Sequence, residues 1–254
     1  MKNGSFQISE HGNLLIYDRI YSAADVKLLI EANRLNGLRI FDFWDPLTSL
    51  DFLREFTFLR RLEIACRYDQ EYSFLNDLAQ LERFSVGPSL PMKNHIDLSA
   101  LVNLQYLSIQ WGTNHVSGLE ACLNIEDLCL VEFPKSDLSL ISQLTEVSRL
   151  RIKTGRLKSI HGIKNLKDLE ELEIGNCRGL ASISNLNGLE NLKSVRIESC
   201  RKISDWDSLE DLPLLRSLKL INCGEIPNFH YRQRFPGLKL ELMGRTKLKS
   251  PAED

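Results

Sequence analysis

Residues 160–177 have the sequence IHGIKNLKDLEELEIGNC, in which the apolar side chains follow two different spacings. They recur at every third position from Ile160 to Leu172, and the interval then shortens to two at Ile174. A three-residue interval keeps side chains on one face of a tight 3₁₀-like coil, whereas a two-residue interval is typical of a strand. The stretch therefore predicts a coil that leads into a short strand.

The same pattern recurs along most of the chain, with a period of about 22 residues. The central apolar residues of the ten predicted strands are Leu38, Leu62, Phe84, Leu107, Leu128, Leu150, Leu172, Val195, Leu218 and Leu238. A unit of this length cannot bury both faces of its apolar set alone, so stacked neighbours must cover it. The repeats predict a solenoid of short parallel strands.

The motif Leu169-x-x-Leu172-x-Ile174-x-x-Cys177 resembles the leucine-rich-repeat consensus L-x-x-L-x-L-x-x-N/C, and the resemblance covers residues 35–242. The short repeats are similar to those of bacterial internalins and phosphatase-regulatory repeat proteins. This resemblance implies an α/β solenoid in the form of a horseshoe or arc. Its strands would line the concave face, and 3₁₀, short-helical and extended segments the convex face. Other residues replace the consensus Asn at Phe43, Arg67, Ser89, Gly112, Phe133, Gly155, Cys177, Cys200 and Cys223.

Three segments are expected along the chain: an N-terminal cap over residues 1–34, the solenoid over 35–242 and a frayed tail over 243–254. In the cap, Phe6–Ile8 and Leu14–Tyr17 predict a short hairpin. Ser22-x-x-Asp25 is similar to a capping box, and it predicts a helix from Ala23 to Arg34.

The composition argues against nucleic-acid and membrane partners. There are 32 basic and 34 acidic residues, which give a net charge of −2. No stretch approaches the roughly 18 uninterrupted apolar residues that a membrane span needs, and Met1–Glu10 does not resemble a secretion signal. We therefore expect a cytoplasmic monomer. The six cysteines form no Cys-x-x-Cys pair and are predicted to be reduced, buried thiols.

Enzyme motifs are absent from the sequence: it has no Gly-rich phosphate loop, no nucleophile elbow and no His-x-x-x-His pair. The five histidines (His11, His95, His115, His161 and His230) are scattered and are expected in turns or in the cap. Cys177, Cys200 and Cys223 fit a buried stack better than a metal site, and Ser204–Asp207 resembles a calcium loop only superficially. We predict no catalytic residue, no cofactor and no metal.

Side chains between the inward apolar residues of each strand must point out onto the concave face. The residues expected to contact a partner there are Phe41, Arg61, Arg83, Tyr106, Gln110, Trp111, Arg149, Arg151, Lys153, Glu173 and Arg196. The basic strand at Arg149–Lys153 has two interpretations. Its charges either pair with Glu171 and Glu173 in a salt-bridge network, or remain in part available to an acidic partner.

The aromatic residues Tyr106, Trp111 and Phe41 are predicted to be exposed and to contact a partner, because leucines and isoleucines already fill the inward positions. Trp206 stands at an apolar repeat position and is predicted to be core. The sequence thus indicates a non-catalytic module that binds another protein on the concave sheet. Two alternatives stay open: an immunity protein that neutralises a bacterial toxin, and a recognition domain that serves a separate enzyme.

Overall fold

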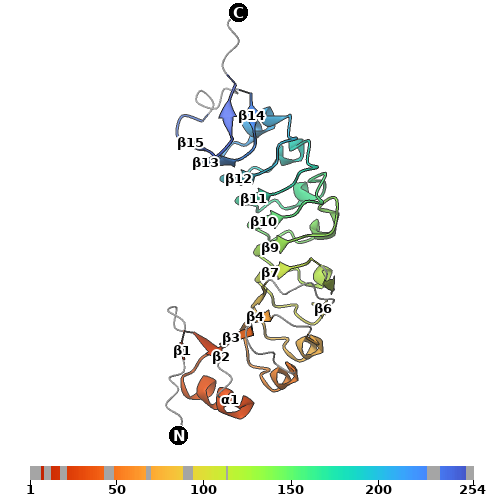
Figure 1. The fold of residues 1–254 in the computed structure, drawn as a ribbon, viewed down its shortest axis with the longest axis vertical. Helices are drawn as coiled ribbons and strands as arrows, with labels where there is room; N and C mark the ends of the chain where they lie inside the picture. Colours follow the sequence, from red (N-terminus) through yellow and green to blue (C-terminus); the bar gives the residue numbers. More distant parts are fainter. Residues whose placement is uncertain are drawn as a thin grey trace, which may run out of the picture. The chain divides into compact units, whose positions relative to one another are not determined.

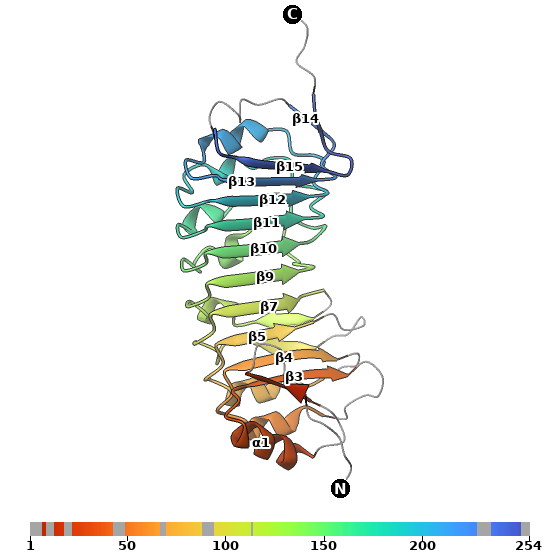
Figure 2. The same cartoon turned by 90° about the vertical axis from the view of Figure 1, so that its left-hand side faces the viewer.

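A computed structural model describes residues 7–8, 13–17, 22–42, 49–66, 70–87, 94–112, 114–227 and 235–249. The chain divides into two compact units, Met1–Asn124 and Ile125–Asp254. In both units, short parallel strands form one side and 3₁₀ turns lie on the opposite side (Figures 1 and 2). Side chains between these two layers make the core.

The first unit begins with a cap. Strand β1 (Gln7–Ile8) pairs antiparallel with β2 (Leu14–Tyr17), as the hairpin prediction required. Helix α1 (Ala23–Ala32) starts at a complete capping box between Ser22 and Asp25, and Val26 and Ile30 on its inner face are buried. The helix ends two residues earlier than predicted, where the Asn33 side chain donates to the Leu29 carbonyl.

Strand β2 also pairs in parallel with the first repeat strand, so the cap continues the sheet. The parallel strands that follow it are β3 (Gly37–Asp42), β4 (Arg61–Cys66), β5 (Arg83–Val86) and β7 (Tyr106–Gln110). The 3₁₀ turns are η1 (Asp51–Glu55), η2 (Ser73–Asp77) and η3 (Leu119–Ala121). A separate parallel pair consists of β6 (His95–Asp97) and β8 (His115–Ser117).

The second unit contains six parallel strands. They are β9 (Asp127–Val131), β10 (Arg149–Lys153), β11 (Glu171–Gly175), β12 (Ser194–Glu198), β13 (Ser217–Ile221) and β15 (Lys239–Met243). The 3₁₀ turns are η4 (Ser139–Ile141), η5 (Ile163–Asn165), η6 (Ser184–Leu186) and η7 (Trp206–Asp211).

Two predictions at the C-terminal end are wrong. Leu240, not Leu238, is the register partner of Leu218, so this repeat position lies two residues later than expected. The backbone N–H of Leu238 instead closes a turn onto the Phe235 carbonyl. Nor is the chain frayed after Arg245: strand β16 (Lys247–Leu248) pairs in parallel with β14 (Glu225–Ile226), and Thr246 is buried.

Backbone hydrogen bonds explain the three-residue spacing of the coil segments. The N–H of Ile163 donates to the carbonyl of Ile160, that of Leu166 to Ile163, and that of Leu169 to Leu166. Each bond closes a 3₁₀-type turn and returns the next apolar side chain to the same face. All four of these side chains are buried, as are the central strand residues from Leu38 to Leu218. The periodic leucines therefore form the core that the sequence predicted.

A left-handed residue follows several strands of the second unit. The residues with positive φ at this position are Glu132, Asn176, Ser199 and Asn222. Their N–H groups donate to the last carbonyl of the repeat strand that follows in the sheet, for example Ser199 to Ile221 and Asn176 to Glu198. These turns therefore add one hydrogen bond beyond the end of the sheet pairing.

Cysteines occupy the consensus Asn position in the last three turns, and Cys177, Cys200 and Cys223 are all buried. Their thiols lie 3.3–3.4 Å from backbone carbonyl oxygens at Gly175, Glu198 and Ile221, which shows weak S–H···O contacts in place of an Asn ladder. A hydrogen bond with Cys200 lowers the pKa of Cys177, and the same contact raises the pKa of Cys200. The five cysteines whose side chains are described are free.

Other sequence predictions have mixed outcomes. Trp206 is buried, as predicted, whereas Trp44, His11 and His230 lie outside the described residues. His95 and His115 are exposed but lie in strands β6 and β8 rather than in turns. Among the helices that the structure describes, none is long and apolar enough to cross a membrane.

Candidate functional site

Outward side chains of the parallel strands form a sheet face in each unit, and each face holds a shallow pocket. The pocket of the first unit has a volume of about 260 Å³ and is lined by Arg39, Arg61, Leu62, Glu63, Arg83, Phe84, Ser85 and Tyr106. We call it the basic pocket. The pocket of the second unit has a volume of about 280 Å³ and is lined by Asp127, Arg149, Leu150, Arg151, Glu171, Leu172, Glu173, Ser194 and Arg196. We call it the balanced pocket.

Asp127 organises one side of the balanced pocket. Its carboxylate accepts from Arg149 Nε at 3.0 Å and from Arg151 Nη2 at 2.7 Å, and the residue is only 8% exposed. Arg151 and Arg196 flank Glu173 in register, but Arg151 turns its Nη2 towards Asp127, the acidic residue of the preceding strand. A nearly buried carboxylate is the stronger partner because water screens it least.

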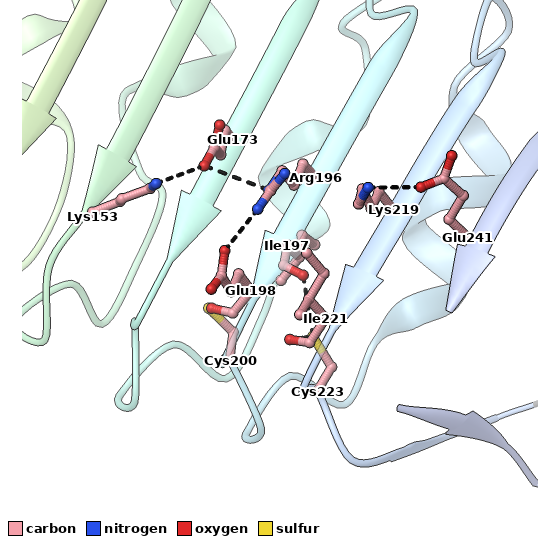
Figure 3. Close-up of polar contacts among 10 residues, drawn as sticks. All are labelled: Lys153, Glu173, Arg196, Ile197, Glu198, Cys200, Lys219, Ile221, Cys223 and Glu241. Atoms are coloured by element: carbon pink, nitrogen blue, oxygen red, sulfur yellow. Dashed lines mark hydrogen bonds and ion pairs between the residues drawn. The ribbon is translucent and has the colours of Figure 1, made fainter. Parts of the chain in front are cut away.

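Glu173 organises the other side and is visible in Figure 3. It lies 3.1 Å from Lys153 Nζ and 3.5 Å from Arg196 Nε, while Arg196 Nη2 donates to Glu198 at 3.0 Å. These contacts favour the salt-bridge interpretation of the basic strand, because each of its three cations lies beside a carboxylate.

The same pattern continues at the last strand. Glu241 accepts from Lys219 Nζ and Lys239 Nζ, each at 2.7 Å. Hydrogen bonds from these two lysines lower the pKa of Glu241 to about 2. The carboxylate is therefore ionised throughout the physiological range, and the ion pairs persist across it.

Glu63 is the single carboxylate of the basic pocket. Arg39 Nε donates to its Oε2 at 2.6 Å, and Arg61 Nε donates to its Oε1 at 2.7 Å. Burial on its own would raise the pKa of Glu63, but the hydrogen bonds from the two arginines outweigh burial and hold this pKa below its ordinary value. Glu63 is thus a fixed negative charge between two cations.

Arg83 makes a different contact. Its guanidinium carbon lies 4.2 Å from the centroid of the Tyr106 ring, within the range of a cation–π interaction. The guanidinium carbon of Arg39 lies farther from an aromatic ring, 5.6 Å from the ring centroid of Phe41, and Phe41 is 47% exposed. The basic pocket therefore has aromatic residues beside its charges.

The two pockets contain equal numbers of arginines but different numbers of acids. Three arginines face three carboxylates around the balanced pocket, whereas three arginines face only Glu63 around the basic pocket. The lining of the basic pocket consequently carries a formal charge of +2, and that of the balanced pocket is neutral. One of the two interpretations of the sequence had left surplus positive charge at Arg149–Lys153 instead.

The structure places most of the predicted contact residues on the sheet faces, with one exception. Phe41, Arg61, Arg83, Tyr106 and Gln110 lie on strands of the first unit, and Arg149, Arg151, Lys153, Glu173 and Arg196 on strands of the second.

Trp111 contradicts its prediction, because it is 5% exposed and belongs to the core. It comes directly after strand β7 and continues the inward series of Leu107 and Ile109, so the period-two alternation itself places it in the core. The N–H of Asn114 donates to its carbonyl and closes a turn.

Arg39 and Asp127 were not among the predicted contact residues. Both occupy outward strand positions, and Asp127 is in register with Arg149. Pairing the outward residues strand by strand would have identified both, because an acid opposite an arginine is a favourable cross-strand pair.

Metal and catalytic groupings receive no support from the described ranges, in which no cluster of three or more His, Cys, Asp or Glu side chains could hold a metal ion. Asp205, in the segment compared with a calcium loop, accepts instead from the backbone N–H groups of Ile183 and Ser184 and from the Ser182 hydroxyl. Its carboxylate caps the 3₁₀ turn η6 of the preceding repeat. The aspartate therefore has a structural role.

Comparison with known proteins agrees with this geometry. The family model described as R13L1/DRL21 LRRs matches residues 153–223, which contain the most regular repeats. This is a leucine-rich-repeat fold. An internalin (inlF) from Listeria monocytogenes is similar over 85% of this chain and 74% of its own, with 22% identity and a TM-score of 0.54.

A leucine-rich-repeat protein of Leptospira interrogans is similar over 94% of this chain and 79% of its own, with 15% identity and a TM-score of 0.40. No curated protein sequence matches. The likeness to the inlF structure therefore shows the fold of the chain.

Proposed function

We propose that this leucine-rich-repeat chain is a non-catalytic module that binds a protein partner on its sheet face. The observation that carries the proposal is the stacking of Arg83 on Tyr106, at outward positions of neighbouring strands beside the basic pocket. Arg and Tyr are enriched among the residues that dominate protein interfaces. Stacking also fixes the long Arg side chain in advance, which reduces the entropy lost on binding.

We propose further that the module acts as a cytoplasmic monomer. Five free cysteines are consistent with a reducing compartment, and the net charge of −2 provides no general attraction to nucleic acid or to anionic membranes. The narrower roles, an immunity protein against a toxin or a recognition domain for a separate enzyme, differ only in the partner that would be bound.

Affinity capture from the native host tests the proposal when it compares three tagged forms of the chain. The wild type and the Lys167→Glu variant should retain the same partner, because Lys167 is exposed in the coil segment that precedes β11. The Tyr106→Ala variant should lose it. Circular dichroism of each form verifies the fold. A partner retained by Tyr106→Ala but lost by Lys167→Glu would contradict binding on the sheet face.

A further inference from the structure

Arg61 and Arg83 are direct register partners on β4 and β5. Like charges directly opposite one another on neighbouring strands destabilise a sheet. Glu63 contacts Arg61 and Arg39, but Arg83 has no ion-pair partner among the residues that the structure describes. The basic pocket thus retains an electrostatic cost in the absence of a partner.

In the balanced pocket, the arginines are arranged differently. Arg149 stands in register between Asp127 and Glu171, and Arg151 has Glu173 as its register partner on β11. Carboxylates on neighbouring strands therefore balance the arginines of the balanced pocket, whereas the arginines of the basic pocket outnumber its carboxylates. Repeat architecture does not require the surplus, since it provides an outward position on β5, at Ser85, where an acid could stand.

We propose that the basic pocket binds carboxylate side chains of an acidic, extended segment of the protein partner. This inference rests on the proposed function and specifies the chemistry of the partner. An added carboxylate near Arg83 and Arg61 would offset their mutual repulsion, as Glu63 already does for Arg61 and Arg39.

Donor geometry favours a carboxylate. A guanidinium has five N–H donors, and Glu63 takes only the Nε group of Arg39. The guanidinium carbon of Arg83 lies over the Tyr106 ring, 4.2 Å from its centroid, and no carboxylate among the described residues pairs with this side chain. The planar fork of N–H donors of a guanidinium matches the two oxygens of a carboxylate.

An extended peptide suits the shape of the site. Its residues would alternate, so that acidic side chains reach the arginines while an apolar side chain rests on the exposed Phe41 ring beside Arg39. Arg39, Arg61 and Arg83 come from three successive strands, which provide a series of donors for more than one carboxylate.

The test is a fluorescence-anisotropy titration of the full chain with a labelled, capped hexaglutamate peptide at low ionic strength. Arg83→Gln should weaken binding about tenfold, because a charge-assisted hydrogen bond is lost. Glu63→Gln should tighten binding, because the only negative charge of the pocket is removed. Arg178→Gln is the matched control, because Arg178 is exposed in a turn outside both pockets, and it should bind as the wild type does. Binding should also weaken as salt is added.

Equal affinity of Arg83→Gln and wild type, or an equal loss in Arg178→Gln, would overturn the inference. Tighter binding of a phosphoserine peptide of the same net charge would overturn the assignment to carboxylates. The capture experiment separates this inference from the proposed function. If the natural partner is lost by Tyr106→Ala but retained by Arg83→Gln, the sheet face binds a partner and the acidic-segment inference is wrong.

Discussion

Arg151 and Asp127 are joined across neighbouring strands by a hydrogen bond of 2.7 Å between Nη2 and Oδ1. Asp127 is almost buried, yet its strand β9 places it at an outward position, where Arg149 also reaches it. Burying a charged carboxylate costs free energy unless cations pair with it. This small network should therefore contribute to the stability of the second unit.

Asp127→Asn should destabilise the protein by about 1–3 kcal/mol, because both arginines lose a charged acceptor while the side-chain volume is kept. Chemical denaturation monitored by circular dichroism measures the change. Glu171→Gln is the control. Glu171 lies on the same sheet face but is exposed, so its substitution should change the free energy of unfolding little. Equal destabilisation by the two variants would remove any special role for Asp127.

Trp111→Ala should cost about 3–5 kcal/mol of stability, since it would leave a cavity where a large buried side chain packs. Tyr106→Ala should cost much less, because the side chain lies on the sheet face and loses mainly its stacking with Arg83. Thermal and denaturant unfolding of the two variants gives the comparison. If Trp111→Ala unfolds like the wild type, then the tryptophan does not belong to the core.

Leu172→Asp should unfold several repeats together. Leu172 is buried between Leu150 and Val195 in the register of the sheet, so an unpaired charge there affects the turns on both sides. Hydrogen exchange should show lost protection in β10, β11 and β12. Loss restricted to residues 169–177 would contradict the coupling between repeats.

Cys122 should make stability depend on alkaline pH. Burial raises the pKa of this thiol from 9.0 to about 12, with smaller contributions from Glu120 and Asp97. Below pH 9 the thiol is protonated in both the folded and unfolded chains. Between pH 9 and pH 12 only the unfolded chain ionises, so the free energy of unfolding should fall as pH rises through this range.

Cys122→Ala is the reference for that pH effect, because it removes the thiol while other titrating groups remain. Denaturant unfolding at several pH values should show a steeper alkaline loss for the wild type than for the variant. Parallel curves would mean that Cys122 has the same pKa in the folded and unfolded chains.

Periodic leucines made the repeat architecture predictable, because each apolar position has the same surroundings in every turn. The cap helix was predictable for a local reason, the capping box between Ser22 and Asp25. The register failed where the period is irregular: Leu238 follows a segment without the three-residue spacing, and the true strand centre is Leu240. The spacing of apolar residues cannot predict the strand register beyond such a segment.

The candidate site was predictable as a surface but not as a set of contacts. Alternation within β7 placed Tyr106 on the sheet face and Leu107 in the core. Continued by one residue, the alternation also places Trp111 inward with Leu107 and Ile109, so the prediction that Trp111 contacts a partner did not follow from the spacing. The alternation of strand residues does not predict which carboxylate pairs with Arg151. Asp127 and Glu173 are both its neighbours in the sheet, and only the folded structure shows that Asp127 is the more buried of the two.

Glu132 and Ser199 adopt left-handed backbone angles, with φ values of 55° and 57°. In residues other than glycine, this conformation costs roughly 1 kcal/mol of stability. In each of these turns the backbone N–H of the left-handed residue donates a hydrogen bond to the end of the neighbouring strand. Glycine at either position would keep the bond and relieve the strain, so a more heat-resistant chain could be engineered without altering either pocket.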